Sequence, residues 1–172
     1  MSAPTPKPTY LKVFPESLPD ELTRLPQWVV WRAVWRPGKD GKPGKWTKVP
    51  YQLDGRLAKS TDPATWAEFG ECLLAYQLRG FDGIGFVFTV DAGIVGIDLD
   101  KCIAEDGTIA EWALKAVHRV NSFTELSPSG TGLHIYARGQ IPMTGTKKGH
   151  VEIYRQSRFF TVTGHLLDEV RP

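Results

Sequence analysis

The stretch Gly93-Ile-Val-Gly-Ile-Asp-Leu-Asp100 is an apolar run that ends in two acids. Apolar residues from Gly93 to Ile97 predict an interior β-strand. Because side chains alternate along a strand, we expect Asp98 and Asp100 on one face. Neighbouring carboxylates repel each other, and burial raises their pKa values unless a cation lies between them. Such oxygen ligands favour Mg²⁺ or Mn²⁺ over zinc, although acids at a strand end are often only solvated.

Further strands are predicted on both sides of this one. Residues rich in β-branched and aromatic side chains indicate strands over 28–35, 46–51, 83–88, 123–126, 133–137, 151–154 and 158–163. The short link between 83–88 and 93–100 predicts that these two strands form an antiparallel pair.

Two helices are expected between the strands. Asp62-Pro63 predicts a helix start, and the helix would run to about Leu78 and end at Gly80. The sequence Thr108-Ile-Ala-Glu111 is a capping box that predicts a second helix, to about Asn121. The predicted class is α+β, with a mixed, largely antiparallel sheet and flanking helices.

Composition predicts an ordinary globular protein. The 172 residues are 41% hydrophobic and 23% charged. No apolar run approaches the roughly 18–20 residues that cross a bilayer, and the N-terminus lacks a signal-peptide core. We therefore expect a cytoplasmic protein with no membrane contact. Cys72 and Cys102 form no zinc-binding spacing, so no zinc is expected.

Domain organisation and charge are uneven along the chain. Residues 1–20 contain five prolines and are predicted to form an extended N-terminal arm, followed by a domain over 21–172. Between Arg32 and Lys59 there are eight basic residues and two acids. Basic patches suit a polyanionic partner, but they also occur on ordinary solvated surfaces.

A second acidic position lies in Val151-Glu152-Ile153-Tyr154, a short apolar strand within a basic segment. If this strand is an antiparallel neighbour of the Asp98 strand, Glu152 becomes a third metal ligand. Alternatively, Glu152 faces solvent or pairs with Arg155 or Arg158.

The loop Ser127-Pro-Ser-Gly-Thr-Gly-Leu-His134 is a candidate phosphate-binding element. Its glycines allow backbone N–H groups, such as that of Gly130, to approach a phosphate closely. Ser127 and Ser129 add hydroxyl donors, and His134 is placed to donate to a triphosphate oxygen. The loop is neither a Walker loop nor a nucleophile elbow. The alternative is a plain turn beside a core histidine.

Two basic side chains outside this loop are also expected at the phosphates. Arg158 precedes an aromatic strand and is suited to clamping a phosphate, and Lys48 is a similar candidate. The alternative is that both residues lie on an ordinary surface.

Taken in order, these motifs resemble the archaeo-eukaryotic primase superfamily. The closest resemblance is to the N-terminal catalytic domains of bifunctional DNA primase–polymerases from phages and plasmids. The three motifs are Asp98-Leu-Asp100, the loop ending in His134, and Val151-Glu152. Flanking sequences also match, so the likeness covers about residues 25–165; they are Trp28-Val-Val-Trp31, Lys48-Val-Pro-Tyr51, Ser60-Thr-Asp-Pro63 and Phe160-Thr-Val-Thr-Gly164.

The resemblance implies a function and a set of partners. It implies template-directed nucleotidyl transfer with two Mg²⁺ or Mn²⁺ ions on Asp98, Asp100 and Glu152, and a nucleotide on the serine loop, with Ser129 favoured over Ser127. It implies an N-terminal α/β module over about 21–90 and an RRM-like catalytic core over about 91–172. The partners would be a single-stranded DNA template and primer, NTPs or dNTPs, and a helicase domain in a longer protein or in trans.

Template contacts would come from the basic hairpin. The residues expected there are Arg32, Arg36, Lys45 and Trp46. A solvated hairpin with core tryptophans is the alternative.

Two other functions remain open. One is a non-catalytic module of RRM-like shape that binds single-stranded nucleic acid, which has little use for three acids on its binding face. The other is a metal-dependent replication-initiator nuclease, but Leu133-His134-Ile135 offers one histidine where such nucleases commonly have two.

Overall fold

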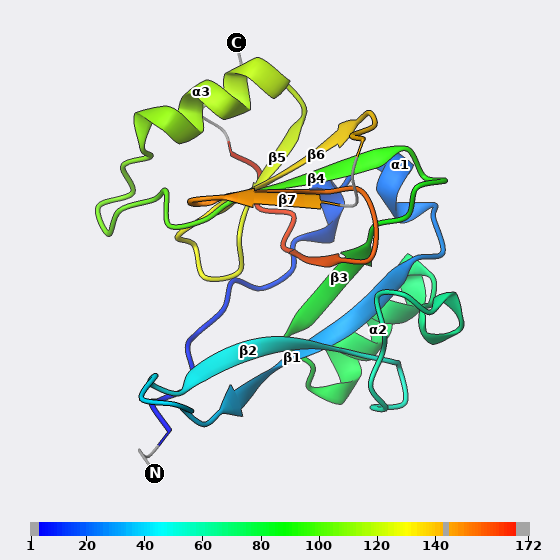
Figure 1. The fold of residues 1–172 in the computed structure, drawn as a ribbon. Coiled ribbons are helices and arrows are strands. Elements are labelled where there is room, and N and C mark those ends of the chain that lie inside the picture. The colour runs from blue at the N-terminus through cyan, green and yellow to red at the C-terminus, as the bar shows by residue number, and fades with distance from the viewer. Residues whose placement is uncertain (1–3, 143–144, 168–172) are drawn as a thin grey trace.

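The computed structural model describes residues 4–142 and 145–167, and in these residues the strands form two antiparallel sheets (Figure 1). The first sheet has the order β2-β1-β3-β9, with bounds Lys45–Tyr51, Trp28–Arg36, Gly83–Val87 and Phe159–Val162. The second has the order β5-β6-β4-β8-β7, with bounds Phe123–Leu126, Leu133–Arg138, Ile94–Leu99, Val151–Tyr154 and Gly145–Lys148. The α+β class is confirmed, with two sheets in place of one.

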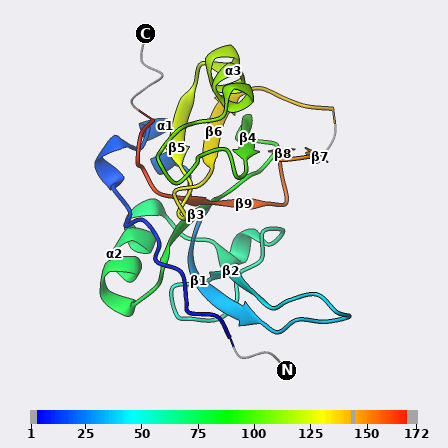
Figure 2. The same cartoon turned by 90° about the vertical axis from the view of Figure 1, so that its left-hand side faces the viewer.

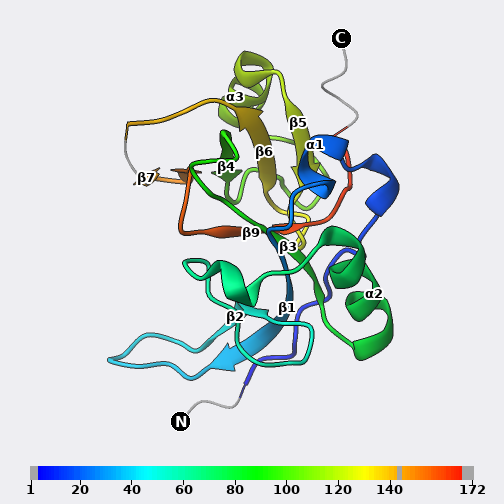
Figure 3. The same ribbon diagram turned by 90° about the vertical axis from the view of Figure 1, so that its right-hand side faces the viewer.

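Helices flank the sheets (Figure 3). The α-helices are α1 (Asp20–Thr23), α2 (Phe69–Arg79) and α3 (Glu111–Val120), and single 3₁₀ turns occur at Pro15–Ser17 and Pro63–Thr65. None of the helices in the described parts of the chain is long and apolar enough to cross a membrane.

The predicted pairing of 83–88 with 93–100 is wrong, because β3 and β4 belong to different sheets. The link between them crosses from one sheet to the other. Phe88 anchors this crossing: its amide donates to the carbonyl of Arg158, and its buried ring stacks on Tyr136. Strand β4 therefore pairs with β6 on one side and β8 on the other.

Both predicted helix starts are also wrong. Asp62 caps only the 3₁₀ turn, and α2 begins later with a capping box between Glu68 and Glu71. The reason is tertiary, because Ala67 exchanges backbone hydrogen bonds with Trp28 of β1 and keeps the chain extended there. Likewise, α3 is preceded by Ala110 with no side-chain cap.

The predicted helix ends are confirmed. Gly80 and Asn121 both adopt the left-handed conformation that commonly closes a helix.

Each sheet buries one face against a helix. The α2 side of the first sheet packs around Trp28, Ile84 and Phe86. Helix α3 covers the second sheet, where Leu99 and Leu133 lie against Val117. Since side chains alternate, the residues next to these apolar ones project from the opposite face of the second sheet.

The proline-rich arm is extended from residue 4 to residue 14, and it is docked along the body (Figure 2). Its Leu11 amide donates to the carbonyl of Pro128 at 2.8 Å, and the Trp46 indole donates to the carbonyl of Thr5 at 3.0 Å. The ring of Tyr10 packs edge-on against Trp31. The arm therefore contacts both the first sheet and the serine loop.

Candidate active site

One row of charged side chains crosses the second sheet. Glu125 of β5 is directly opposite His134 of β6, and His134 is opposite Asp98 of β4. Asp98 is in turn opposite Glu152 of β8, and Glu152 is opposite Lys147 of β7. Cross-strand partners share a face, so this row lies on the face away from α3. The strand register thus brings together Asp98 and Glu152, which are 54 residues apart in the sequence. Their strands are the antiparallel neighbours that the sequence-based prediction required for Glu152 to join Asp98.

Asp98 is the central acid of the row. Burial raises the pKa of its carboxyl group, and the negative charges of Glu152 and Asp100 raise it further. His134 and Lys48 act in the opposite direction; the imidazole Nε2 lies 3.7 Å from Asp98 Oδ1. A half-buried carboxylate among other acids is a place where a cation is favoured.

The other two acids differ in their surroundings. Asp100 directly follows β4 and is exposed. Glu152 accepts a 2.9 Å ion pair from Lys147, in place of the arginine partners considered from the sequence. Within residues 4–142 and 145–167, no three His, Cys, Asp or Glu side chains converge into a formed metal site. Asp98 and Glu152 are thus cross-strand neighbours, Asp100 follows two residues after Asp98, and Glu152 is turned toward Lys147.

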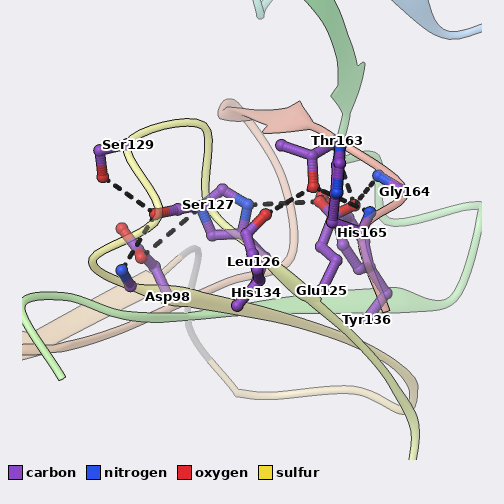
Figure 4. A network of polar contacts seen from close by, with 11 residues as sticks. Asp98, Glu125, Leu126, Ser127, Ser129, His134, Tyr136, Thr163, Gly164 and His165 are labelled. Atoms are coloured by element: carbon purple, nitrogen blue, oxygen red, sulfur yellow. Dashed lines mark hydrogen bonds and ion pairs between the residues drawn. The ribbon is translucent and has the colours of Figure 1, made fainter. Parts of the chain in front are cut away.

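The serine loop is closed by its own hydrogen bonds (Figure 4). Ser127 is buried, and its hydroxyl oxygen accepts from the amide of Gly132 at 3.1 Å. The amide of Gly130 donates to the carbonyl of Ser127 at 2.9 Å, so it shapes the turn and does not point to a ligand. Ser129 is exposed, with its hydroxyl 3.2 Å from that of Ser127. Of the two serines, Ser129 is the accessible one.

His134 is buried at the start of β6, directly after this loop. Its ring is tilted against that of Phe160, with the two centroids 4.9 Å apart. The second ring nitrogen, Nδ1, lies 3.4 Å from Glu125 Oε1. The imidazole therefore has a carboxylate at each nitrogen.

Lys48 approaches the acids from the other sheet. It lies on β2, opposite Ala33 of β1. Desolvation lowers the pKa of its amine, while attraction to Asp98 and Asp100 acts to raise it. A partly desolvated amine under the influence of both acids fits the predicted role at a triphosphate.

Arg158 is exposed, just before β9. Its guanidinium lies 4.7 Å from the ring centroid of Tyr154 and donates to the Tyr154 hydroxyl at 3.4 Å. Tyr154 is two residues beyond Glu152 on β8 and shares its face. Arg158 thus lies against a tyrosine that belongs to the same face as the charged row.

The residues predicted to contact a template are divided between two faces of the hairpin. Trp46 pairs with Trp35 and shares a face with Lys48, two residues further along β2. Arg36 pairs with Lys45 on the opposite face.

Arg32 lies on this opposite face as well. Its guanidinium is 4.2 Å from the ring centroid of Phe81, and it donates to the carbonyl of Arg79 at the end of α2. Among the four predicted residues, Trp46 is the one that shares the Lys48 face.

Two residues of the row were missed from the sequence. Glu125 is a single acid in the short strand Phe123–Leu126, the same signal that singled out Glu152. Lys147 lies on β7, whose sequence Gly-Thr-Lys-Lys has no apolar alternation to predict a strand.

The α+β fold and the acid–histidine row are what the resemblance to primase–polymerase domains predicts. No family model matches the chain. The chain is 36% identical over 155 residues to the DNA Primase-polymerase of Nitratiruptor phage NrS-1. The alignment covers 86% of this chain and 20% of the phage protein, so the chain spans about a fifth of its relative's length. This similarity confirms the resemblance and supports a primase–polymerase domain.

Proposed function

We propose that this chain is the catalytic domain of a primase–polymerase that performs template-directed nucleotidyl transfer. It would synthesise primers, extend DNA, or do both, in phage or plasmid replication. The observation that carries the proposal is the register that sets His134, Asp98 and Glu152 side by side on adjacent strands. The similarity to a phage DNA Primase-polymerase supports the same activity.

The acids are suited to divalent ions. Asp98, Asp100 and Glu152 offer only carboxylate oxygens, which Mg²⁺ and Mn²⁺ prefer. The raised pKa of Asp98, with burial as its largest cause, supports this, because a cation would offset the disfavoured negative charge. Two such ions, when bound, would lower the pKa of the attacking 3′-hydroxyl and neutralise charge on the triphosphate. Glu152 would exchange its pairing with Lys147 for a metal ion.

The remaining groups would bind and align the nucleotide. Ser129 presents an exposed hydroxyl, and His134 directs Nε2 toward Asp98. Lys48 supplies a positive charge from the first sheet, and Arg158 supplies another from its place on Tyr154. Transfer of this kind depends mainly on alignment and charge neutralisation, which these side chains provide.

Partners follow from this arrangement. The incoming nucleotide would be an NTP or a dNTP, and the primer and single-stranded template would be DNA. Trp35 and Trp46 form an edge-to-face pair on the Lys48 side of the hairpin, and aromatic rings there suit stacking of unpaired bases. We expect a helicase domain in the full-length protein or in trans.

Primer extension with matched variants tests the proposal. Asp98→Asn and Asp100→Asn should each abolish metal-dependent nucleotide incorporation without changing the circular dichroism spectrum. Glu105→Gln, which neutralises an exposed acid in the loop after β4, is the control and should keep full activity. Full incorporation by either aspartate variant would overturn the assignment.

The same assay separates the alternatives. Template binding without incorporation in the unsubstituted protein would favour the non-catalytic module. Metal-dependent cutting of the template would favour the nuclease. Supplying NTPs and dNTPs separately on an unprimed strand also shows whether the domain initiates primers.

A further inference from the structure

The carboxylate of Glu125 is fully buried, at 0% exposure, in the strand next to His134 (Figure 4). Its Oε2 accepts from the amides of Thr163 and Gly164, at 3.0 and 2.7 Å. Its Oε1 accepts from the hydroxyl of Tyr136 at 2.8 Å and contacts His134 Nδ1 at 3.4 Å. These donors come from β6 and from the segment that follows β9 of the first sheet.

The two oxygens of Glu125 therefore do different things. Oε2 ties β5 to the backbone after β9, which is a structural role that any acceptor could fill. Oε1 faces two side chains, and Tyr136 stays protonated because burial, reinforced by the charge of Glu125, raises its pKa. A buried carboxyl group is costly unless its oxygens are hydrogen-bonded, and both oxygens of Glu125 accept hydrogen bonds here.

The contact between Oε1 and the ring of His134 points to a second role. With Nδ1 facing Glu125 Oε1 and Phe160 packed on the ring, the imidazole is held in one orientation. Its Nε2 then faces Asp98 Oδ1, 3.7 Å away on the next strand. The hydrogen bond at one imidazole nitrogen generally sets the orientation and role of the other.

We infer that Glu125 is a positioning residue that holds the imidazole of His134 so that Nε2 meets the triphosphate of the incoming nucleotide. The inference rests on the proposed function, since it requires His134 to contact the nucleotide. Glu125 itself is fully buried, so it would act on the nucleotide only through His134.

Glu125→Gln separates this role from the structural one. The amide oxygen of glutamine still accepts from the backbone at Thr163 and Gly164, but its NH₂ group presents a donor to His134 Nδ1. Tyr136→Phe is the matched control, because it removes the other hydrogen bond to the same Oε1 and leaves the contact with His134. We expect Glu125→Gln to raise the nucleotide KM in primer extension about tenfold. Tyr136→Phe should lower the melting temperature about as much as Glu125→Gln does. Its nucleotide KM should stay close to that of the unsubstituted protein.

A double-mutant cycle shows whether Glu125 acts through His134. His134→Ala should raise the nucleotide KM, and adding Glu125→Gln to it should raise the KM no further. An unchanged KM in Glu125→Gln, or the same increase in both backgrounds, overturns the inference and leaves the proposed function standing. An unchanged KM in His134→Ala removes the nucleotide role of His134, and the inference with it. If Glu125→Gln does not fold, Glu125→Asp carries the same test, because it withdraws the carboxylate from His134 by one methylene.

Discussion

Asp98→Asn should make the protein more stable and inactive at the same time. The pKa of Asp98 is raised in the folded state above its ordinary value of 3.8. Above pH 3.8 and up to the raised pKa, the folded state holds more protons than the unfolded state. Stability therefore falls as pH rises through that window, and the loss is complete above the raised pKa. Asparagine keeps the shape of the side chain and removes the charge that causes the loss.

The gain comes first from burial, which is the largest cause of the raised pKa, and the strand register adds repulsion between like charges. Asp98 lies directly opposite Glu152, and like charges in that position cost about 0.2–1 kcal/mol. Lost attraction to His134 and Lys48 works against the gain, which places it at the lower end of this range. For a chain of this size the melting temperature should rise by roughly 0.5–2 °C at neutral pH without metal.

Divalent ions should make the unsubstituted protein more stable than Asp98→Asn, which is the reverse of the order expected without metal. At a free Mg²⁺ concentration ten times its Kd, the unsubstituted protein should gain about 1.4 kcal/mol, or roughly 3–6 °C. Asp98→Asn should lose most of this metal-dependent rise in melting temperature. Its incorporation rate should fall by more than about 100-fold. Thermal melting in EDTA and in Mg²⁺ or Mn²⁺ measures both effects, with Glu105→Gln as the control. A variant that melts lower than the unsubstituted protein in EDTA, or keeps its full metal shift, would refute the reasoning.

Three further predictions concern other parts of the molecule. Gly96→Ala should lower the free energy of unfolding by about 1–3 kcal/mol in chemical denaturation, because a Cβ there would lie 2.3 Å from the ring of Phe88; unchanged stability would contradict the packing. Burial raises the pKa of Cys72 to about 12 and that of Cys102 to about 11, so neither thiol should react with a thiol reagent at pH 8 until the protein is unfolded. Lys48→Met should raise the nucleotide KM about tenfold with little change in melting temperature, and an unaltered KM in steady-state kinetics would exclude Lys48 from the nucleotide site.

The sequence was most informative where chemistry and periodicity coincide. The apolar run from Gly93 to Ile97 predicted an interior strand, and that strand has neighbours on both sides. The single acid at Glu152 predicted a cross-strand partner for Asp98, which the register provides. Helix ends at Gly80 and Asn121 were predictable because a left-handed residue is a local requirement.

Features set by distant contacts were not predictable. A short link between strands does not specify a common sheet, and burial of Phe88 sends the chain from one sheet to the other. Asp62-Pro63 is a sound local helix start, but pairing of Ala67 with Trp28 delays the helix. Glu125 stands out only because it lies opposite His134 on the neighbouring strand, and no local sequence pattern predicts that pairing.

The docked arm also affects when the domain can fold during synthesis. The ring of His165 lies 2.6 Å from the carbonyl oxygen of Lys12, which the ribosome adds 153 residues earlier. At 5–20 residues per second, roughly 8–30 s separate the two ends of this contact. During that interval the arm lacks its partners in the segment after β9, so its full docking waits until that segment has been made. The arm beside the serine loop would thus be fully docked only after the segment that follows β9 emerges.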